Sequence, residues 1–488
     1  MIPKFLVKLD LSKSLSVLLF ISFSAGITFG YKYTNLFVSY TLTILAISIA
    51  YVLNRRNRSL SFDVIILIIF FFLGILWQIP SSLSLAKAAK FLGQDNNMVL
   101  LVTSLPESTD TRNTFNGQIR KINDRKLQRK IKVRVIDYTK DLEYLGVYQV
   151  KGKLIQRKYN DYKYYCLWVK KDSKVIKIPP GFWKKIRRQT IDYVFSIYSK
   201  NCNSISNDFL GAVFLGRREL IKSQRLAFSD AGVSHLLAIS GLHIGLFSLV
   251  IFFTLRFFSI SFRISLAISL LILYGYVFLT DISPSTMRAT IMYSVLAISF
   301  FLKRKYDPLN SLALAGIIAL LIYPQSLFSI GFQLSFISVF SIILGFKIFK
   351  LKLLSNPILN YIKQVLFCSF FVTLGLMPIV SYYFGKIYLL SIFYNIIFIP
   401  FFTLILAINF LLLIFSPISF IAQSLGACLS LIIPLFIKLV YFLGSIRFSY
   451  ISYKFSPAGV LAYYISLSGI CVYLTIGIRD KISLKIEK

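Results

Sequence analysis

The chain has 488 residues, 56% of them hydrophobic and 16% aromatic, and its mean hydropathy is +0.71. One soluble core cannot bury so apolar a chain, so the composition excludes a soluble globular protein and predicts an integral membrane protein. The 55 Lys and Arg residues outnumber the 19 Asp and Glu residues, and the net charge of +36 favours an anionic partner such as nucleic acid, lipid headgroups or an acidic polymer. A basic proteome or cationic cytoplasmic loops would give the same net charge. The positions of the charged residues must therefore distinguish these explanations from an anionic partner.

Apolar runs of membrane-spanning length fall into two groups, separated by a polar insert. Three runs come first, near 14–29, 36–53 and 62–79. About nine follow, near 235–256, 264–280, 285–302, 308–323, 329–346, 365–384, 388–413, 421–443 and 457–477. The first run also fits a cleaved signal peptide ending near 22–26, but an uncleaved helix is the preferred interpretation.

Short cationic loops predict the orientation, because Lys and Arg near span ends stay in the cytoplasm. Such residues precede the first run and lie between the second and third runs: Lys4, Lys8, Lys13, Arg55, Arg56 and Arg58. The later cationic loops around 256–263, 303–305, 347–350 and 479–481 fall on the same side. We therefore expect about twelve spans, with both termini in the cytoplasm and the insert on the extracytoplasmic side; the family resemblance described below implies that the membrane is the bacterial cytoplasmic (inner) membrane.

The insert, at about 80–233, holds 30 Lys and Arg against 13 Asp and Glu, an excess that orientation does not explain. Apolar and polar residues alternate over 130–138, 147–157, 164–171 and 174–178, which is the pattern of short strands. The sequence thus predicts four regions: a three-helix segment (1–80), a small β-barrel of OB type (81–180), an amphipathic interfacial linker (181–232) and a membrane channel domain (233–480).

A barrel of this kind binds single-stranded nucleic acid in a basic groove lined with aromatic rings. The candidate contacts for DNA interleave cations with aromatic residues: Lys132, Arg134, Tyr138, Lys153, Arg157, Lys158, Tyr162, Lys163, Trp168 and Lys170. About half of the aromatic residues in this region are expected to belong to the barrel core instead.

The five cysteines suggest at most one disulfide bond. Cys166 and Cys202 fall in the exterior region, where an oxidising compartment would allow them to pair. The sequence has no Cys-x-x-Cys pair or Cys/His cluster, so we expect no metal site and no cofactor. In the linker, 182–198 carries cations on one side and apolar residues on the others, as in a helix at a membrane surface.

The string HLLAISGLHIG at 235–245, preceded by Phe228 and Gly232, resembles the ComEC family, the inner-membrane DNA-uptake channels of naturally transformable bacteria. Further matches follow in order: SPSTMRATIM at 283–292, Pro324, GFQLSF at 331–336, Asn395 and Pro400. The resemblance covers about 200–415. It implies a channel that passes single-stranded DNA into the cytoplasm during natural transformation, working with an exterior DNA receptor and with cytoplasmic motor or single-strand-binding proteins.

The chain departs from the family at two points. Gly216, Arg217 and Arg218 stand where the family commonly has an acidic residue after the glycine. Many members also carry a C-terminal metallo-β-lactamase-like nuclease domain, and the chain is expected to lack it, which leaves strand degradation to a separate nuclease. The two histidines are eight residues apart, roughly 12 Å along a helix, and cannot share a metal ion.

Physically, the string combines small residues with polar ones. Gly241 and Gly245 form a G-x-x-x-G step, and Ala238 and Ser240 are also small, which predicts close helix packing. His235 is expected at the exterior end of the span. His243 lies two turns deeper, where an imidazole either lines a wet path or bonds another helix.

The predicted DNA path consists of the polar residues of the string and of later spans: His235, Ser240, His243, Arg288, Gln333, Ser335 and Asn395. Arg288 could also reach the exterior interface, and Gln333 and Ser335 could serve as hydrogen-bonding contacts between helices. No phosphate-binding loop of the Gly-x-x-x-x-Gly-Lys type occurs, so the chain is predicted to be a passive conduit, with no catalytic residues and no enzyme activity.

Two other functions compete with this interpretation. A membrane glycosyltransferase or polymerase acting on lipid-linked sugars also has many spans, but it needs an acid pair or base that the scattered carboxylates do not supply. A small-solute transporter is disfavoured by the basic exterior domain and by the lack of an evident inverted repeat.

Overall fold

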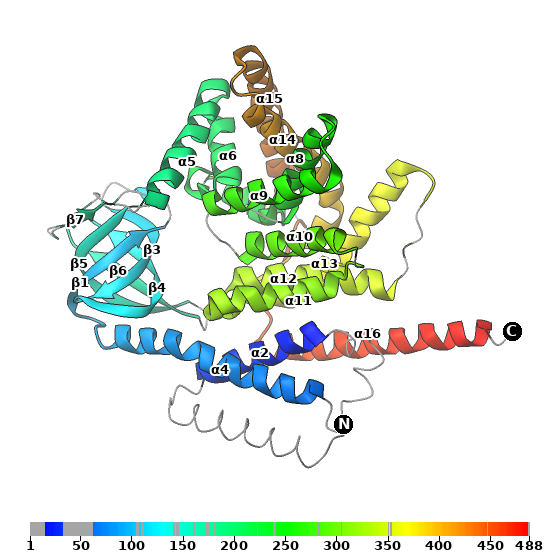
Figure 1. Ribbon diagram of the computed structural model, residues 1–488, viewed down its shortest axis with the longest axis horizontal. Helices are drawn as coiled ribbons and strands as arrows, with labels where there is room; N and C mark the ends of the chain where they lie inside the picture. The colour runs from blue at the N-terminus through cyan, green and yellow to red at the C-terminus, as the bar shows by residue number, and fades with distance from the viewer. Residues whose placement is uncertain are drawn as a thin grey trace.

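The computed structural model describes residues 15–32, 62–103, 107–108, 112–139, 142, 146–159, 162–171, 173, 175–179, 182–221, 223–237, 241–280, 284–303, 305–349, 351, 354–446 and 448–486. A β-barrel lies at one end of the molecule, on the left in Figure 1, and helices form the rest. The barrel is inserted between two helices, because α4 leads into its first strand and its last strand leads into α5.

The membrane part consists of apolar helices. They are α2 (Leu15–Lys32), α4 (Phe62–Ala89), α8 (Gly241–Phe257), α9 (Phe262–Thr280), α10 (Pro284–Phe301), α11 (Pro308–Ile322), α12 (Ile330–Ile348), α13 (Pro357–Phe384), α14 (Ser391–Ile414), α15 (Ser419–Gly444) and α16 (Pro457–Ile486). Among the described residues, α9 and α12 to α15 are long and apolar enough to cross a bilayer, and the other helices contain shorter apolar stretches. The chain is a multi-pass membrane protein, and the predicted run at 36–53 lies outside the described residues.

Local sequence explains where several of these helices begin. Asp307 and Asn356 each accept hydrogen bonds from the first turn of the helix that follows, and a proline occupies the first position of both α11 and α13. Proline is suited to that position because its missing N–H would have no partner there. Ser329 caps α12 in the same way through the N–H of Phe332.

The exterior insert forms the predicted barrel. Its strands are β1 (Asp95–Val102), β2 (Glu107–Ser108), β3 (Asn113–Ile122), β4 (Arg125–Asp137), β5 (Val147–Tyr159), β6 (Tyr162–Val169) and β7 (Val175–Ile178). Five of them follow the order β1-β3-β4-β6-β5, and β1 pairs with β5 to close the barrel. Only β4 and β6 run parallel among these pairs. This small closed barrel confirms the OB-like prediction.

Alternation along the strands fills the barrel interior. Leu100, Val135, Leu154 and Leu167 are fully buried in it, together with Ala88 from α4. Helix α4 therefore continues beyond the predicted boundary at residue 80 and seals one side of the barrel core.

The linker consists of α5 (Phe182–Asn201), α6 (Ser204–Phe214), η2 (Arg218–Ile221), α7 (Arg225–Asp230) and η3 (Ser234–Leu236). α5 has a buried face and an exposed face. Ile191 and Tyr198 are buried, and Phe182, Trp183 and Tyr193 are exposed. The buried face packs on protein, because α5 contacts α6, α9 and α15.

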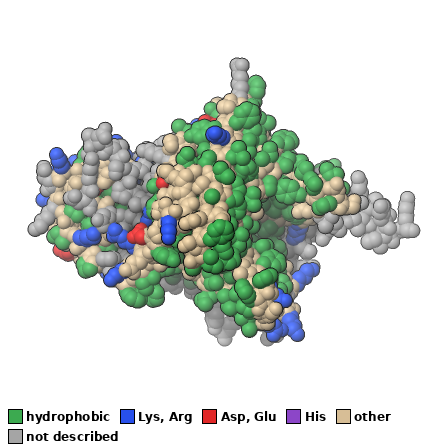
Figure 2. All heavy atoms as spheres, turned by 90° about the horizontal axis from the view of Figure 1, so that it is seen from above, with side chains coloured by type: hydrophobic (Ala, Val, Ile, Leu, Met, Phe, Trp, Pro, Cys, Tyr) green, Lys and Arg blue, Asp and Glu red, His purple; other side chains and the backbone are tan. Residues whose placement is uncertain are grey.

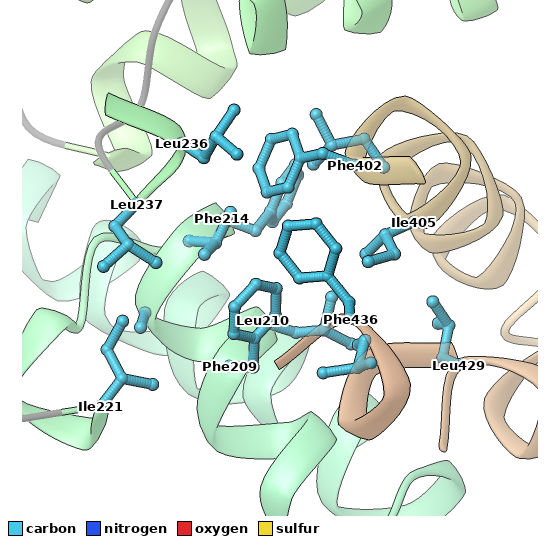
Figure 3. Close-up of a cluster of buried hydrophobic side chains, with 14 of the residues drawn as sticks. Phe209, Leu210, Phe214, Ile221, Leu236, Leu237, Phe402, Ile405, Leu429 and Phe436 are labelled. Carbon is cyan, nitrogen blue, oxygen red and sulfur yellow. The ribbon is translucent and has the colours of Figure 1, made fainter. Parts of the chain in front are cut away.

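The largest hydrophobic cluster joins this linker to the membrane helices. Figure 3 shows Phe209 and Phe214 of α6 facing Phe402 of α14 and Phe436 of α15. The rings of Phe209 and Phe436 are 6.0 Å apart, as are those of Phe402 and Phe436. The linker is thus part of the packed helical core. On the face seen in Figure 2, hydrophobic side chains dominate the helical part, as expected of a lipid-facing surface.

Candidate functional site

The signature string 235–245 is not one continuous helix. α7 ends at Asp230, and Gly232 follows with a φ of 70°, where a Cβ would lie 2.9 Å from Tyr388. Glycine fits this turn on both counts. His235 then falls in the short turn η3, and α8 begins only at Gly241. The prediction of a helix over 235–256 is therefore wrong for its first turn, and the predicted site residues Ala238 and Ser240 lie outside the described residues.

An ion pair anchors the turn that precedes the string. Lys386 lies in β8 (Lys386–Ile387), which pairs with β9 (Ile451–Ser452), and its Nζ is 2.6 Å from Oδ1 of Asp230. The same ammonium lies 3.8 Å from the centre of the Tyr450 ring. Burial acts to lower the pKa of Lys386, but the hydrogen bond to Asp230, the charge of Asp230 and the nearby Tyr388 and Tyr450 together hold this pKa above its ordinary value. These contacts fix α7 against the two-stranded sheet of β8 and β9.

The two histidines lie in different surroundings. His235 is exposed in η3, whereas His243 is fully buried in the first turn of α8. The ring of His243 meets Phe402 edge to face, with centroids 5.2 Å apart. His243 thus contacts the large hydrophobic cluster through α14. Within the described part of the chain, no group of three His, Cys, Asp or Glu residues is arranged to hold a metal ion.

Arg288 is the buried cation of the membrane part, with only 7% of its surface exposed. It lies on α10, and its Nε donates to Oγ of Ser335 on α12 at 2.9 Å. Its Nη1 lies 3.9 Å from the sulfur of Met292. A Cβ built on Gly241 would lie 3.3 Å from Nη2, so the guanidinium rests against the first residue of α8. The structure therefore brings together three predicted site residues, Gly241, Arg288 and Ser335, from three helices.

The electrostatics of this arrangement favour an anion. None of the ion pairs found among the described residues gives Arg288 a carboxylate partner. The N-terminal turn of α8, which starts beside the guanidinium, adds further partial positive charge. A buried cation without a counter-ion is costly unless water or an anion reaches it. The three helices thus create a positively charged position that a phosphate group would stabilise.

The two glycines of the string have different roles. Gly241 packs against Arg288 and Ala289, and a Cβ built on Gly241 would lie 3.7 Å from the Cβ of Ala289. The small size of Gly241 thus makes room for the Arg288 side chain. Gly245 is exposed and has no described atom within 4 Å of a Cβ position. Among the described residues no helix lies against Gly245, so close packing at this glycine stays a prediction.

Close backbone contacts occur at other glycines, which the sequence interpretation missed. A Cβ on Gly26 or on Gly74 would overlap the backbone of the other helix where α2 and α4 pack together. A Cβ on Gly426 of α15 would overlap the carbonyl oxygen of Asn201, at the end of α5. Gly26 and Gly30 have the G-x-x-x-G spacing, whereas Gly74 and Gly426 have no glycine four residues before or after them.

The other predicted path residues bond protein groups. Gln333 donates from Nε2 to the carbonyl of Leu327 at 3.3 Å. Asn395 of α14 donates from Nδ2 to Oγ of Ser369 on α13 at 3.0 Å. Gln333 and Asn395 thus hold helical segments together, while Ser335 orients the guanidinium of Arg288.

Several predicted contacts for DNA gather on the outer surface of β4, β6 and β5. Register places Lys153 opposite Trp168, and the guanidinium of Arg157 lies 5.5 Å from the Trp168 ring centre. Arg134 lies opposite Cys166 on the neighbouring pair of strands, with its side chain exposed. This group, Arg134, Lys153, Arg157 and Trp168, is named the barrel patch. It combines three cations with one aromatic ring on adjacent strands.

Two other predicted barrel residues, Lys170 and Tyr138, make contacts of their own. Lys170 is 2.7 Å from Asp95, and this hydrogen bond lowers the pKa of the Asp95 carboxyl. Tyr138 follows the end of β4, where its N–H donates to the carbonyl of Val169. The side chains of the others lie outside the described residues: Lys132, Lys158, Tyr162 and Lys163.

Cys166 and Cys202 are free thiols in the structure. Cys166 is buried on β6 of the barrel, and burial raises the pKa of its thiol. Cys202 follows α5 and packs against the hydrophobic cluster of the helical part. The two residues belong to separate packing units, which is why the candidate disulfide is not formed.

The turn that departs from the family pattern has a local role. Gly216 adopts a φ of 77°, and Arg217 extends from this turn to Asp192 of α5 at 2.9 Å. Its guanidinium also lies 4.5 Å from the ring centre of Phe195. Arg217 therefore ties the end of α6 to α5.

Comparison with known proteins supplies independent findings. The profile of the family described as "Competence protein" matches residues 213–476, more than half of the chain. ComE operon protein 3 of Bacillus subtilis (strain 168) is 31% identical over 229 residues, which cover 46% of this chain and 28% of that protein. An uncharacterized protein of Aquifex aeolicus (strain VF5) is 32% identical over 146 residues, which cover 29% of this chain and 34% of that protein. The chain thus matches well under two thirds of either relative, and no solved structure matches it significantly.

Proposed function

Because the chain belongs to the competence protein family, we propose that it passes DNA, as a single strand, across the bacterial cytoplasmic membrane during natural transformation. The observation that carries the proposal is the Arg288 guanidinium, buried among membrane helices and held by Ser335 against the start of α8. A membrane protein retains a buried cation when the cation faces a polar path or a charged ligand.

The charge of single-stranded DNA explains why the proposed path contains few cations. Each nucleotide carries one phosphate, and an apolar barrier excludes each phosphate unless water or a cation accompanies it. One guanidinium beside a helix N-terminus offers each passing phosphate a brief, favourable contact. Many buried cations would instead hold the strand in place.

The barrel serves as the extracytoplasmic collector in this proposal. The barrel patch presents Arg134, Lys153 and Arg157 to phosphates and the Trp168 ring to bases. Cations and aromatic faces of this kind bind single strands with little sequence preference. The cationic loops keep the barrel outside the cytoplasm, where it meets incoming DNA before the membrane helices do.

The proposal assigns no chemical step to this chain. Transport would draw its energy from a cytoplasmic motor or from proteins that bind the emerging single strand. An exterior receptor would deliver DNA, and a separate nuclease would remove the second strand. Lipid surrounds the helices, whose outer faces carry exposed Phe, Leu and Ile side chains.

A deletion strain tests the proposal. Labelled DNA should still reach the extracytoplasmic compartment, should not become protected in the cytoplasm, and should yield no transformants, while surface polysaccharide stays unchanged. Normal transformation without the chain would contradict the proposal. Loss of surface polysaccharide with normal DNA uptake would favour the glycosyltransferase alternative.

A further inference from the structure

Three helices of the family-matched region contain a proline in their interior. Proline has no N–H, so it leaves the carbonyl four residues earlier without its helical donor. Within the described residues, α13, α14 and α15 have these prolines at Pro378, Pro400 and Pro434. The carbonyls that lose their donors belong to Leu374, Ile396 and Ser430.

Each of these carbonyls accepts a hydrogen bond from a side chain of another element. The donors are Tyr463 to Leu374 at 2.8 Å, Tyr361 to Ile396 at 3.4 Å, and Asn203 to Ser430 at 2.9 Å. An unsatisfied carbonyl is costly in an apolar surrounding, so such donors stabilise a bend that the helix could not keep alone. Because the donors come from outside the bent helix, moving them changes the stability of the bend.

The contact at Ser430 is the most elaborate of the three. Asn203 lies in the turn between α5 and α6, and its Nδ2 donates to the carbonyl of Ser430 while its Oδ1 accepts from the N–H of Ser206. The backbone N–H of Asn203 also donates to Oγ of Ser430 at 2.9 Å. Gly426, one helical turn earlier on α15, lets the backbone of Asn201 lie directly on the helix. The turn is therefore seated on α15 at the carbonyl that Pro434 leaves without a helical donor.

The helix that leads into this turn follows the exterior barrel directly in the sequence. Strand β7 ends at Ile178 and α5 begins at Phe182, so only a short connection separates the barrel from the helix. A helix of 20 residues is about 30 Å long. At its start, Arg187 donates to the carbonyl of Leu279 on α9. α5 thus extends from the barrel side of the molecule to the turn that contacts Ser430 of α15.

The bend also lies close to the signature string. Phe436 follows Pro434 by two residues, and its ring is 6.0 Å from that of Phe402. Phe402 in turn contacts His243, with ring centroids 5.2 Å apart. The rings of Phe436 and Phe402 (Figure 3) thus connect the Pro434 region of α15 with His243 in the first turn of α8.

We propose that Asn203 is a positioning residue that latches a proline hinge in α15, and that movement of the barrel acts through α5 and this latch to change the bend of α15 while DNA passes. The transport readout of this inference rests on the proposed function. The hinge itself rests on the contacts at Ser430.

Pro434→Ala tests the hinge, because alanine restores the backbone N–H that Ser430 lacks. The variant should reach normal protein level and unfold in detergent at or above the wild-type midpoint, yet transformation should fall about 10-fold, since a continuous helix removes the bend. Asn203→Ser should lower the unfolding midpoint and also reduce transformation. Serine still caps α6, but it is too short to supply the lost donor.

The double variant separates a hinge from a purely structural contact. Asn203→Ser with Pro434→Ala should regain the wild-type midpoint, because Ser430 again has a donor, while transformation stays low. Recovery of both, or wild-type transformation by Pro434→Ala alone, would overturn the inference. Asn201→Ser is the matched control, because the Asn201 side chain bonds only the carbonyl of Ile197 within its own helix. It should transform normally.

Asn203→Ser also tests the latch by itself. If Pro434→Ala is poorly expressed, wild-type transformation by Asn203→Ser at normal protein level would overturn the inference. The deletion strain keeps the two proposals distinct. Normal uptake without the chain removes the proposed function, whereas loss of uptake on deletion with normal transformation by Pro434→Ala removes only the hinge.

Discussion

Replacing Arg288 by glutamine should reduce the delivery of DNA to the cytoplasm without lowering the amount of folded protein. Glutamine keeps a polar side chain near Ser335 but removes the positive charge next to Gly241. A hydrogen bond to a charged group contributes about 1.5–3 kcal/mol. If one such contact with phosphate is made at the highest barrier, uptake should fall about 10- to 150-fold.

The assay is transformation frequency, normalised to protein level in the membrane, with labelled DNA counted in the extracytoplasmic and cytoplasmic fractions. Arg288→Lys should be intermediate, because lysine keeps the charge but loses the planar fork that reaches Ser335. Arg256→Gln is the matched control, because Arg256 is an exposed cation at the other end of α8 and should not affect uptake. Wild-type transformation by Arg288→Gln at normal expression would refute the role given to this guanidinium.

Three further predictions concern the barrel, the helix contacts and the orientation. The isolated barrel (84–178) should bind single-stranded DNA of unrelated sequences, with affinity that falls steeply as salt rises, and undetectable binding at low salt would exclude it as the collector. Gly426→Ala should destabilise the folded protein by about 1–3 kcal/mol because its Cβ overlaps the backbone of a neighbouring segment, whereas Gly245→Ala should be neutral in thermal unfolding. A reporter active only in the cytoplasm should work after Lys305 and fail at Lys140, and activity at Lys140 would reverse the orientation.

The helices and part of the barrel could be predicted from the sequence because their patterns have few alternatives. Long apolar runs gave the membrane helices, and alternation gave β4 to β7. β1 and β3 were missed. β3 contains Asn116 and Gly117, which are uncommon in strands, although Phe115 and Ile119 keep the inward alternation on either side. Burial on one face, rather than strand propensity, identifies this strand.

The site was predicted residue by residue but not as an arrangement. Arg288 and Ser335 stand out as polar residues in apolar runs, yet their contact depends on how α10 and α12 pack, which no local pattern encodes. Glycine spacing predicts close packing only where a neighbouring helix lies on that face, and the described residues place no helix against Gly245. Asn203 was missed, since a polar residue between two helices looks like an ordinary cap until Ser430 is seen beside it.

The most direct measurement of the central claim uses the purified chain in lipid vesicles that enclose a single-strand-binding protein. Fluorescent single-stranded DNA added outside should become protected from added nuclease over time, because binding inside prevents its return. Vesicles with the Arg288→Gln variant should protect much less DNA. If wild-type vesicles protect no more DNA than vesicles without the chain, the chain is not by itself a path for single-stranded DNA, and the account is wrong.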